Sequence, residues 1–140
     1  MKHPVHPFVV HFPIACWSLS TLGDLTGIMF SNSHTQTIGL LMLIGCISAI
    51  GAMAAGIYEI CKVKDFISIS NIVDHHMYAA VATWSFYSLS LYLRWDHGFY
   101  SAPNIWAIVT SVVGFISLII TGWYGANLVY THGVGINKTS

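Results

Sequence analysis

The chain has 140 residues, room for a single domain, and 55% of them are hydrophobic whereas only 7% are charged. An ordinary soluble domain carries roughly 25% charged residues, so this chain has too few charges to cover a water-facing surface, and lipid must be the solvent for most of it. The formal net charge of zero argues against a nucleic-acid partner and against an acidic cation buffer.

Four apolar stretches follow one another along the chain, at about 9–30, 38–60, 76–93 and 105–129. Each is able to span a hydrocarbon core of about 30 Å, which needs roughly 20 helical residues. Helix is the required conformation because lipid offers no partners to unpaired backbone amides. We therefore predict an all-α fold, a bundle of four transmembrane helices that forms one integral membrane domain, residues 1–140. No repeat or low-complexity segment is recognised.

The first stretch opens among histidines and prolines, which interrupt the apolar core that a cleavable signal peptide would need. Pro7 suits the first turn of a helix, and Pro13 is expected to kink the helix beside His11. If this segment is helical, the step from His6 to His11 turns the second side chain by about 140°, at about 100° per residue. The two rings would then not point at one ion.

Carboxylates lie inside or beside three of the stretches. Asp24 lies within the first, where an ionisable group needs a partner or water, and we interpret it as an interhelical hydrogen-bonding residue rather than a proton carrier. Glu59 lies near the end of the second stretch, and Asp74 just precedes His75. Either carboxylate would be able to orient a ligating imidazole through its second nitrogen; the alternative is an interfacial carboxylate in water.

The second and fourth stretches carry small residues every three or four positions, a spacing that lets helices approach closely in a membrane. The alternative is that these positions leave clearance for a flat cofactor against a helix. The small residues are Gly45, Ala49, Ala52 and Gly56 in the second stretch and Ser111, Gly114, Thr121, Gly122 and Gly125 in the fourth.

Eight histidines are many for a membrane protein of this size, and most of them fall at one face of the predicted bundle. Only His34 and His97 fall at the other face. Imidazole is the commonest metal ligand in proteins, so the pattern predicts a haem or metal site; the alternative is that these side chains merely lie at headgroup level. The predicted ligands are His6, His11, His76 and His132, with His3, His75, Glu59 and Asp24 as secondary candidates.

The basic residues predict an orientation. All four lysines, Lys2, Lys62, Lys64 and Lys138, fall on the side that holds both termini, whereas the other side carries only Arg94. The positive-inside rule then places both termini in the cytoplasm.

Segment 6–15, HPFVVHFPIA, resembles the opening motif of a bacterial membrane family known as domain of unknown function 2231. Segment 122–135, GWYGANLVYTHGVG, resembles its closing motif, and Asp24, His76 and Arg94 match further positions. The chain departs from the family pattern at Asn127, where a glutamate is expected, and at Ala80, where an asparagine is expected. The resemblance implies a four-helix protein of the bacterial inner membrane and singles out the same four predicted histidine ligands, but it supplies no activity.

The first function that we consider is a b-type haem protein that transfers electrons within the membrane. Helix bundles hold haem between facing helices, and paired histidine axial ligands suit an iron that cycles between oxidation states. Four histidines suffice for two such haems, or for one haem with two supporting residues. The redox partner would be quinone or another redox protein, which would make the chain a quinone-linked membrane cytochrome.

The second function is binding or transport of a transition-metal ion such as zinc, copper or iron, because imidazole suits these metals. Against transport, no chain of polar ligands crosses all four stretches. The third is a non-catalytic subunit or assembly factor of a membrane complex, and so small a bundle is also compatible with a homo-oligomer. For a haem or metal site, we expect His11→Ala or His76→Ala to reduce cofactor occupancy, and His34→Ala or His97→Ala to leave it unchanged.

Overall fold

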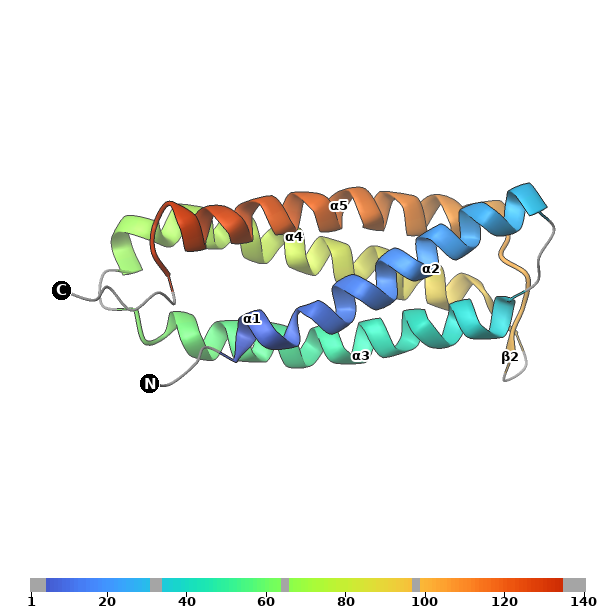
Figure 1. The fold of residues 1–140 in the computed structure, drawn as a ribbon, viewed down its shortest axis with the longest axis horizontal. Helices are drawn as coiled ribbons and strands as arrows, with labels where there is room; N and C mark the ends of the chain where they lie inside the picture. Colours follow the sequence, from blue (N-terminus) through green and yellow to red (C-terminus); the bar gives the residue numbers. More distant parts are fainter. Residues whose placement is uncertain (1–4, 31–33, 64–65, 97–98, 135–140) are drawn as a thin grey trace.

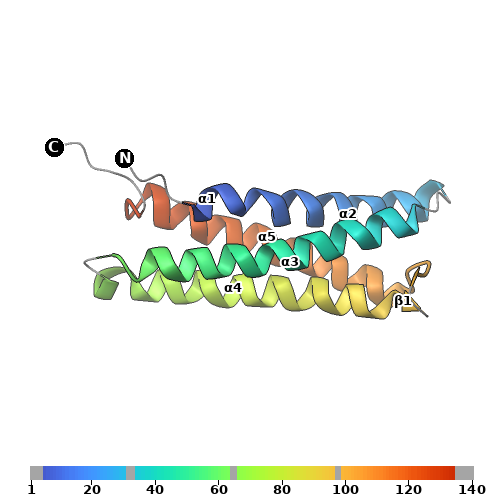
Figure 2. The same cartoon turned by 90° about the horizontal axis from the view of Figure 1, so that it is seen from below.

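Four helical rods lie side by side along one axis in the computed structural model, which describes residues 5–30, 34–63, 66–96 and 99–134 (Figure 1). Figures 1 and 2 show that the first and third rods run in one direction and the second and fourth in the other. The prediction of an all-α membrane bundle is confirmed. The rods are α1 (His6–Val9) continued by α2 (His11–Phe30), α3 (Thr35–Ile60), α4 (Phe66–Leu93) and α5 (Ile105–Tyr130).

Because of this alternation, α1 begins and α5 ends at the same end of the bundle (Figure 1). We call this end the histidine end and define it as residues 5–11, 52–63, 66–79 and 121–134. The opposite end holds the connections between α2 and α3 and between α4 and α5.

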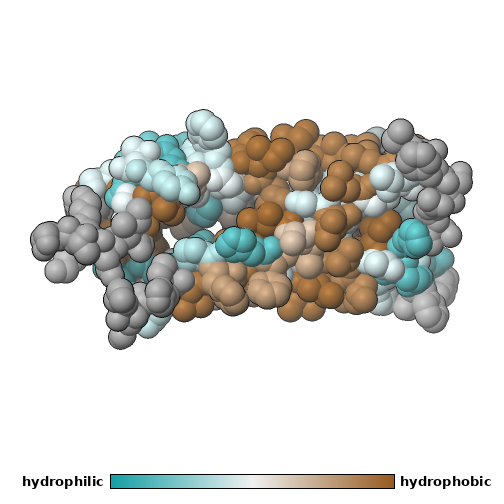
Figure 3. Space-filling model, in the orientation of Figure 1, coloured by the Kyte–Doolittle hydropathy of each residue, from teal (hydrophilic) through white to brown (hydrophobic). Residues whose placement is uncertain are grey.

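Three of the rods are long and apolar enough to cross a membrane within the described part of the chain: His6–Ile28, Thr35–Ile60 and Ile105–Tyr130. The remaining rod, α4, is less apolar because its buried face carries hydroxyl groups such as those of Thr83 and Ser90. Apolar side chains of α4, including Leu89, are exposed on its outer face. Figure 3 shows the overall result, a hydrophobic band between two more polar ends.

The start of α4 differs from the expectation, because the helix begins at Phe66 and not near residue 76. Its additional turns bury Ile69 and Val73, which pack with Leu128 of α5 at the histidine end. Polar residues between them lower the hydropathy of this segment but leave the helical spacing of its buried face intact. Hydropathy alone therefore places the start of α4 too far towards the C-terminus.

A short hairpin, β1 (Trp95–Asp96) and β2 (Phe99–Tyr100), closes the connection between α4 and α5 and was not predicted. The side chain of Gln36, in the first turn of α3, donates a hydrogen bond to the Tyr100 carbonyl at 2.8 Å. The Tyr100 ring lies over Gly39, where a Cβ would come within 2.2 Å of it. The hairpin is thus attached to the start of α3.

The rings of Trp17 and Tyr87 stack in the centre of the bundle, with centroids 4.7 Å apart and planes 1° from parallel. Glycines on the neighbouring helices make room for this stack. A Cβ at Gly45 would lie 2.6 Å from the Trp17 ring, and one at Gly114 would lie 3.1 Å from the Tyr87 ring. At these two positions the small residues serve close helix packing.

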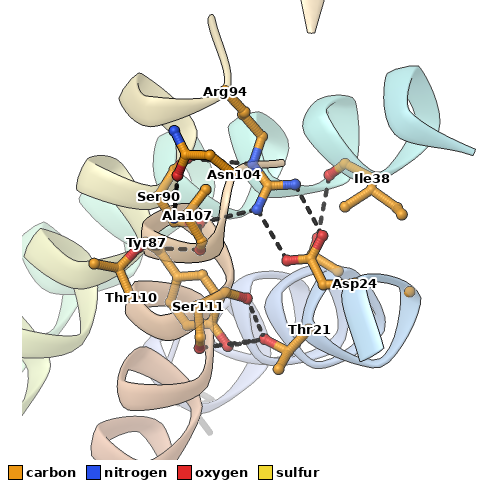
Figure 4. Close-up of polar contacts among 12 residues, drawn as sticks. Thr21, Asp24, Ile38, Tyr87, Ser90, Arg94, Asn104, Ala107, Thr110 and Ser111 are labelled. Carbon is orange, nitrogen blue, oxygen red and sulfur yellow. Dashed lines mark hydrogen bonds and ion pairs between the residues drawn. The ribbon is translucent and has the colours of Figure 1, made fainter. Parts of the chain in front are cut away.

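Hydroxyl groups beside this stack satisfy one another (Figure 4). The Thr21 hydroxyl is hydrogen-bonded to the Tyr87 hydroxyl at 2.8 Å and to the Ser111 hydroxyl at 2.9 Å. The three side chains come from α2, α4 and α5, so one cluster joins three rods. Inside a bilayer such groups need protein partners, because lipid supplies none.

A buried ion pair joins α2 to the end of α4 (Figure 4). The Arg94 guanidinium donates two hydrogen bonds to the Asp24 carboxylate, each at 2.9 Å, and both side chains have 0% exposure. Arg94 also donates to the hydroxyl of Ser90 at 2.9 Å, and Ser90 donates to the carbonyl of Ala107 on α5 at 2.6 Å. Asp24 is therefore an interhelical partner of Arg94, which argues against a place for it in the cofactor site.

Gly45 and Gly51 of α3 provide a matched pair for testing the central packing. We expect Gly45→Ala to destabilise the bundle by about 1–3 kcal/mol through overpacking, because Trp17 is held against Tyr87 and cannot retreat easily. Nothing lies within 4 Å of a Cβ built at Gly51, so Gly51→Ala should instead stabilise the helix by up to about 1 kcal/mol. Thermal melts in detergent would measure both, and equal effects would contradict this packing.

Candidate functional site

Two of the predicted histidine ligands meet at the histidine end. The rings of His6, on α1, and His76, on α4, have centroids 6.4 Å apart and planes at 88°. Both side chains are half-buried. Residues far apart in the sequence thus bring two imidazoles to the same depth in the bundle.

A backbone carbonyl holds each ring from a neighbouring helix. Nδ1 of His6 donates to the Ala52 carbonyl of α3 at 2.7 Å, and Nδ1 of His76 donates to the Thr121 carbonyl of α5 at 3.1 Å. A carbonyl only accepts, so in the neutral rings the proton resides on Nδ1 and Nε2 keeps its lone pair. This is the arrangement that proteins use to orient a metal-ligating histidine.

Glycines lie against both rings on the helices that supply these carbonyls. A Cβ at Gly56 would approach the His6 ring to 3.1 Å, and one at Gly125 would approach the His76 ring to 3.2 Å. Both glycines belong to the small-residue stripes recognised in the sequence. Here the small residues make room for two histidine side chains of the chain itself.

The Glu59 side chain positions His6 by binding the backbone of the segment that carries it. The Glu59 carboxylate accepts from the backbone N–H groups of Val5 at 2.5 Å and His6 at 3.0 Å. These groups lie at the N-terminus of α1, where helix donors lack intrahelical partners and negative charge is favourable. The expectation that Glu59 would bond to an imidazole nitrogen is not met, because Ala52 already occupies Nδ1 of His6.

Hydroxyl groups fix the carbonyl that holds His76. Thr83 of α4 donates to the Ser117 hydroxyl at 2.9 Å and is hydrogen-bonded to the Thr121 hydroxyl at 3.1 Å. The turn of α5 that contains Thr121 is thereby tied to α4, the helix that carries His76. The predicted site did not include the carbonyls of Ala52 and Thr121, because every residue has a backbone carbonyl and the sequence does not mark the ones that accept a bond. It did not include Thr83 either, whose hydroxyl acts on the site only through α5.

The two other predicted ligands lie apart from this pair. His11 is exposed, and its Nδ1 is hydrogen-bonded to the Phe8 carbonyl within its own rod at 3.3 Å. His132 is also exposed, in the turn that follows α5. His6 and His11 point in different directions, as their five-residue spacing predicts. His132 was predicted as a ligand but is exposed, because chain order gives the depth of a residue along the bundle and not whether its side chain faces the interior.

The secondary candidates contribute less. His75 is exposed, with Nδ1 hydrogen-bonded to the Asn71 carbonyl at 2.6 Å and its ring 5.6 Å from that of Tyr124. Asp74 is exposed beside it. His3 and His97 lie outside the described residues.

The described residues contain no group of three or more histidine, cysteine, aspartate or glutamate side chains placed to hold a metal ion. A bare ion would normally require more ligands than this pair; structural zinc, for example, takes four. The site therefore offers two imidazole lone pairs, one from each half of the bundle, and suits a metal whose remaining ligands come from a cofactor.

A family model described as "Predicted membrane protein (DUF2231)" matches residues 2–138 of the chain. No curated protein matches the chain, and no solved structure matches it. Since the match covers nearly the whole length, the chain belongs to the DUF2231 family of predicted membrane proteins.

Proposed function

We propose that this protein is a b-type membrane cytochrome in which His6 and His76 are the axial ligands of one haem and whose function is electron transfer. The observation that carries this proposal is a pair of neighbouring, perpendicular imidazole rings, each with Nδ1 bound to a carbonyl and Nε2 left for a ligand. The proposal reduces the four expected ligands to two.

The separation of the rings fits one metal between them. An imidazole nitrogen binds a transition metal at about 2 Å, and the ring centroid lies about 1 Å further out, so two rings on opposite sides of one ion have centroids roughly 6 Å apart. The distance between the His6 and His76 centroids is 6.4 Å. Planes at 88° are compatible with this arrangement, because each ring can rotate about its own metal–nitrogen bond.

The donor set favours haem over the alternatives. A porphyrin supplies four equatorial nitrogens, so two imidazoles complete the coordination of its iron, and the bound group would supply one-electron transfer. Quinone carbonyl oxygens need hydrogen-bond donors, whereas both Nε2 atoms are acceptors in the neutral rings. We therefore place quinone, or another redox protein, as the partner of this site and not as its occupant.

The residues of the chain prepare the site before any ligand arrives. The carbonyls of Ala52 and Thr121 set the direction of the two lone pairs, and Glu59 secures the turn that carries His6. Preorganisation of this kind lowers the entropy cost of binding. Gly56 and Gly125 keep side chains away from the rings, where a flat macrocycle would need room.

We expect the purified protein to show a strong Soret band and sharp reduced α and β bands after expression with an adequate haem supply. His6→Ala and His76→Ala should each abolish this six-coordinate spectrum, because each removes one axial ligand. His11→Ala, His132→Ala and His34→Ala should retain it, since those rings are exposed.

Two results would contradict this proposal. A wild-type protein without a Soret band rules out haem, and metal found by elemental analysis in such a sample supports the transition-metal alternative. Loss of the spectrum in His132→Ala to the same degree as in His76→Ala would contradict the assignment of the ligands.

The glycines provide a test of the space around the rings. Gly125→Leu would push a side chain against His76, and an overpacking cost of about 1–3 kcal/mol corresponds to a loss of haem affinity of roughly 5- to 150-fold. Gly122 is on the same helix but has nothing within 4 Å of a Cβ, so Gly122→Leu is the control. Haem titrations followed by absorption would compare them, and equal affinities would exclude this role for Gly125.

We also propose that the histidine end faces the cytoplasm of a bacterial inner membrane. Arg94, the one basic residue assigned to the opposite side, is buried and paired with Asp24, so it does not count as a loop charge. Lys62 lies at the histidine end, and chain order assigns the other three lysines to the same side. The positive-inside rule favours the cytoplasm for that side.

Cys61, which is exposed at the end of α3, reports on this orientation. A membrane-impermeant maleimide should label it in inside-out vesicles and not in intact cells stripped of their outer membrane, because the reagent reaches only thiols on its own side. Cys61→Ser, which should remove the label, is the control. Labelling in the intact cells instead would reverse the orientation.

A further inference from the structure

Residues of the first rod contact residues of α4 and of its C-terminal end at one constant sequence separation. Three such contacts follow one another along the bundle, and each joins positions that are 70 residues apart. When two equivalent segments run in parallel and every residue meets its own counterpart, an approximate twofold axis lies between the segments. The three contacts are His6 with His76, Trp17 with Tyr87, and Asp24 with Arg94.

Contacts from the first rod to α3 are repeated by contacts from α4 to α5. The bond from the His6 ring to the Ala52 carbonyl has its counterpart in the bond from His76 to Thr121. The Ser20 hydroxyl donates to the Ile38 carbonyl at 3.3 Å, and the Ser90 hydroxyl donates to the Ala107 carbonyl at 2.6 Å. The donors again differ by 70 residues, and the acceptors differ by 69.

Equivalent glycines are separated by the same 69 residues as these acceptors. Gly45 makes room for Trp17, and Gly114 makes room for the counterpart of Trp17, Tyr87. Gly56 and Gly125 stand in the same relation to the two histidines. Hydrogen bonds, ring contacts and close approaches therefore all relate α1–α2–α3 to α4–α5.

The sequence carries traces of this relation at these positions. Residues 17–20 read WSLS and residues 87–90 read YSLS, while residues 45–50 read GCISAI and residues 114–119 read GFISLI. These matches contradict the expectation that the chain contains no internal repeat. The repeat is hard to recognise because the identical positions are few and are scattered among apolar residues that have exchanged with one another.

We infer that the chain consists of two copies of one helical hairpin, residues 6–60 and 76–130, related by an approximate twofold axis along the bundle, and that the His6–His76 site lies on this axis. Each hairpin then presents one imidazole, one orienting carbonyl and one glycine to the same ligand. The ligand that matches is planar, with two equivalent faces and a metal at its centre. The identity of this ligand rests on the proposed haem function, whereas the repeat does not.

The axis also explains the buried charges. In a dimer of two identical hairpins, the position of Asp24 would face itself, and two like charges would be buried together. In one duplicated chain the two copies can differ, and an aspartate in the first meets an arginine in the second. Ser20 stands four residues before Asp24 as Ser90 stands four before Arg94, so the two sites are built alike around opposite charges.

Exchange of the two charges tests the repeat in the full-length protein. Asp24→Arg and Arg94→Asp singly should reduce the yield of folded, monodisperse protein by at least about tenfold, because each leaves like charges buried together. The double exchange should restore the yield to within about twofold of the wild type, since Ser20 can then support the arginine as Ser90 does now. Size-exclusion profiles and melting temperatures in detergent measure this rescue.

An exchange of the aromatic pair is the contrasting control. Trp17→Tyr combined with Tyr87→Trp should not be tolerated, because the moved hydroxyl would face Leu91, the counterpart of its present partner Thr21. Loss of this partner in the buried centre of the bundle is costly. This variant should therefore lose folded yield even if the charge exchange is tolerated.

The outcomes separate the two proposals. If the double charge exchange is no better folded than the single variants, the twofold relation is overturned, whatever the absorption spectrum shows. If the double exchange is rescued but the wild type binds no haem, the repeat stands and the haem function fails. If the double exchange is rescued and retains the Soret band, both proposals are supported.

Discussion

The bidentate ion pair between Asp24 and Arg94 sets the register on which the rest of the bundle depends. Two charges buried away from water are tolerable only when they meet in good geometry, so α2 and α4 have one permitted alignment along their length. That alignment also places Tyr87 on Trp17 and, at the far end of the rods, His76 opposite His6. The same register therefore governs both the packed centre and the candidate site.

The two ends of the bundle are built for different tasks. At the end opposite the histidines, a buried ion pair, the hydrogen bond from Ser90 to the Ala107 carbonyl and a hairpin that contacts α3 hold the helices together. At the histidine end, α1 depends on a single carboxylate from α3 for the capping of its first residues. Rigid packing at the opposite end allows the histidine end to present two imidazoles and two glycines around a shared space.

The repeated hairpin gives this division a simple origin. At the candidate site the two copies keep the same residues, as with His6 and His76 or Gly56 and Gly125. Where identical residues would repel each other, the copies have diverged, as with Asp24 and Arg94. The Asp24–Arg94 pair thus shows how divergence between the two hairpins removes a repulsion that identical copies would have.

Composition and periodicity by themselves determined the membrane environment, the four rods and the gathering of histidines at one end, because each follows from local hydropathy and chain order. The sequence also indicated that Asp24 needs an interhelical partner, without naming Arg94. Only the tertiary structure decided which imidazoles face each other, because the rotation of a helix about its own axis is set by packing against its neighbours. For the same reason the sequence could not separate His6 and His76, which turn inward onto carbonyls, from His11 and His132, which are exposed.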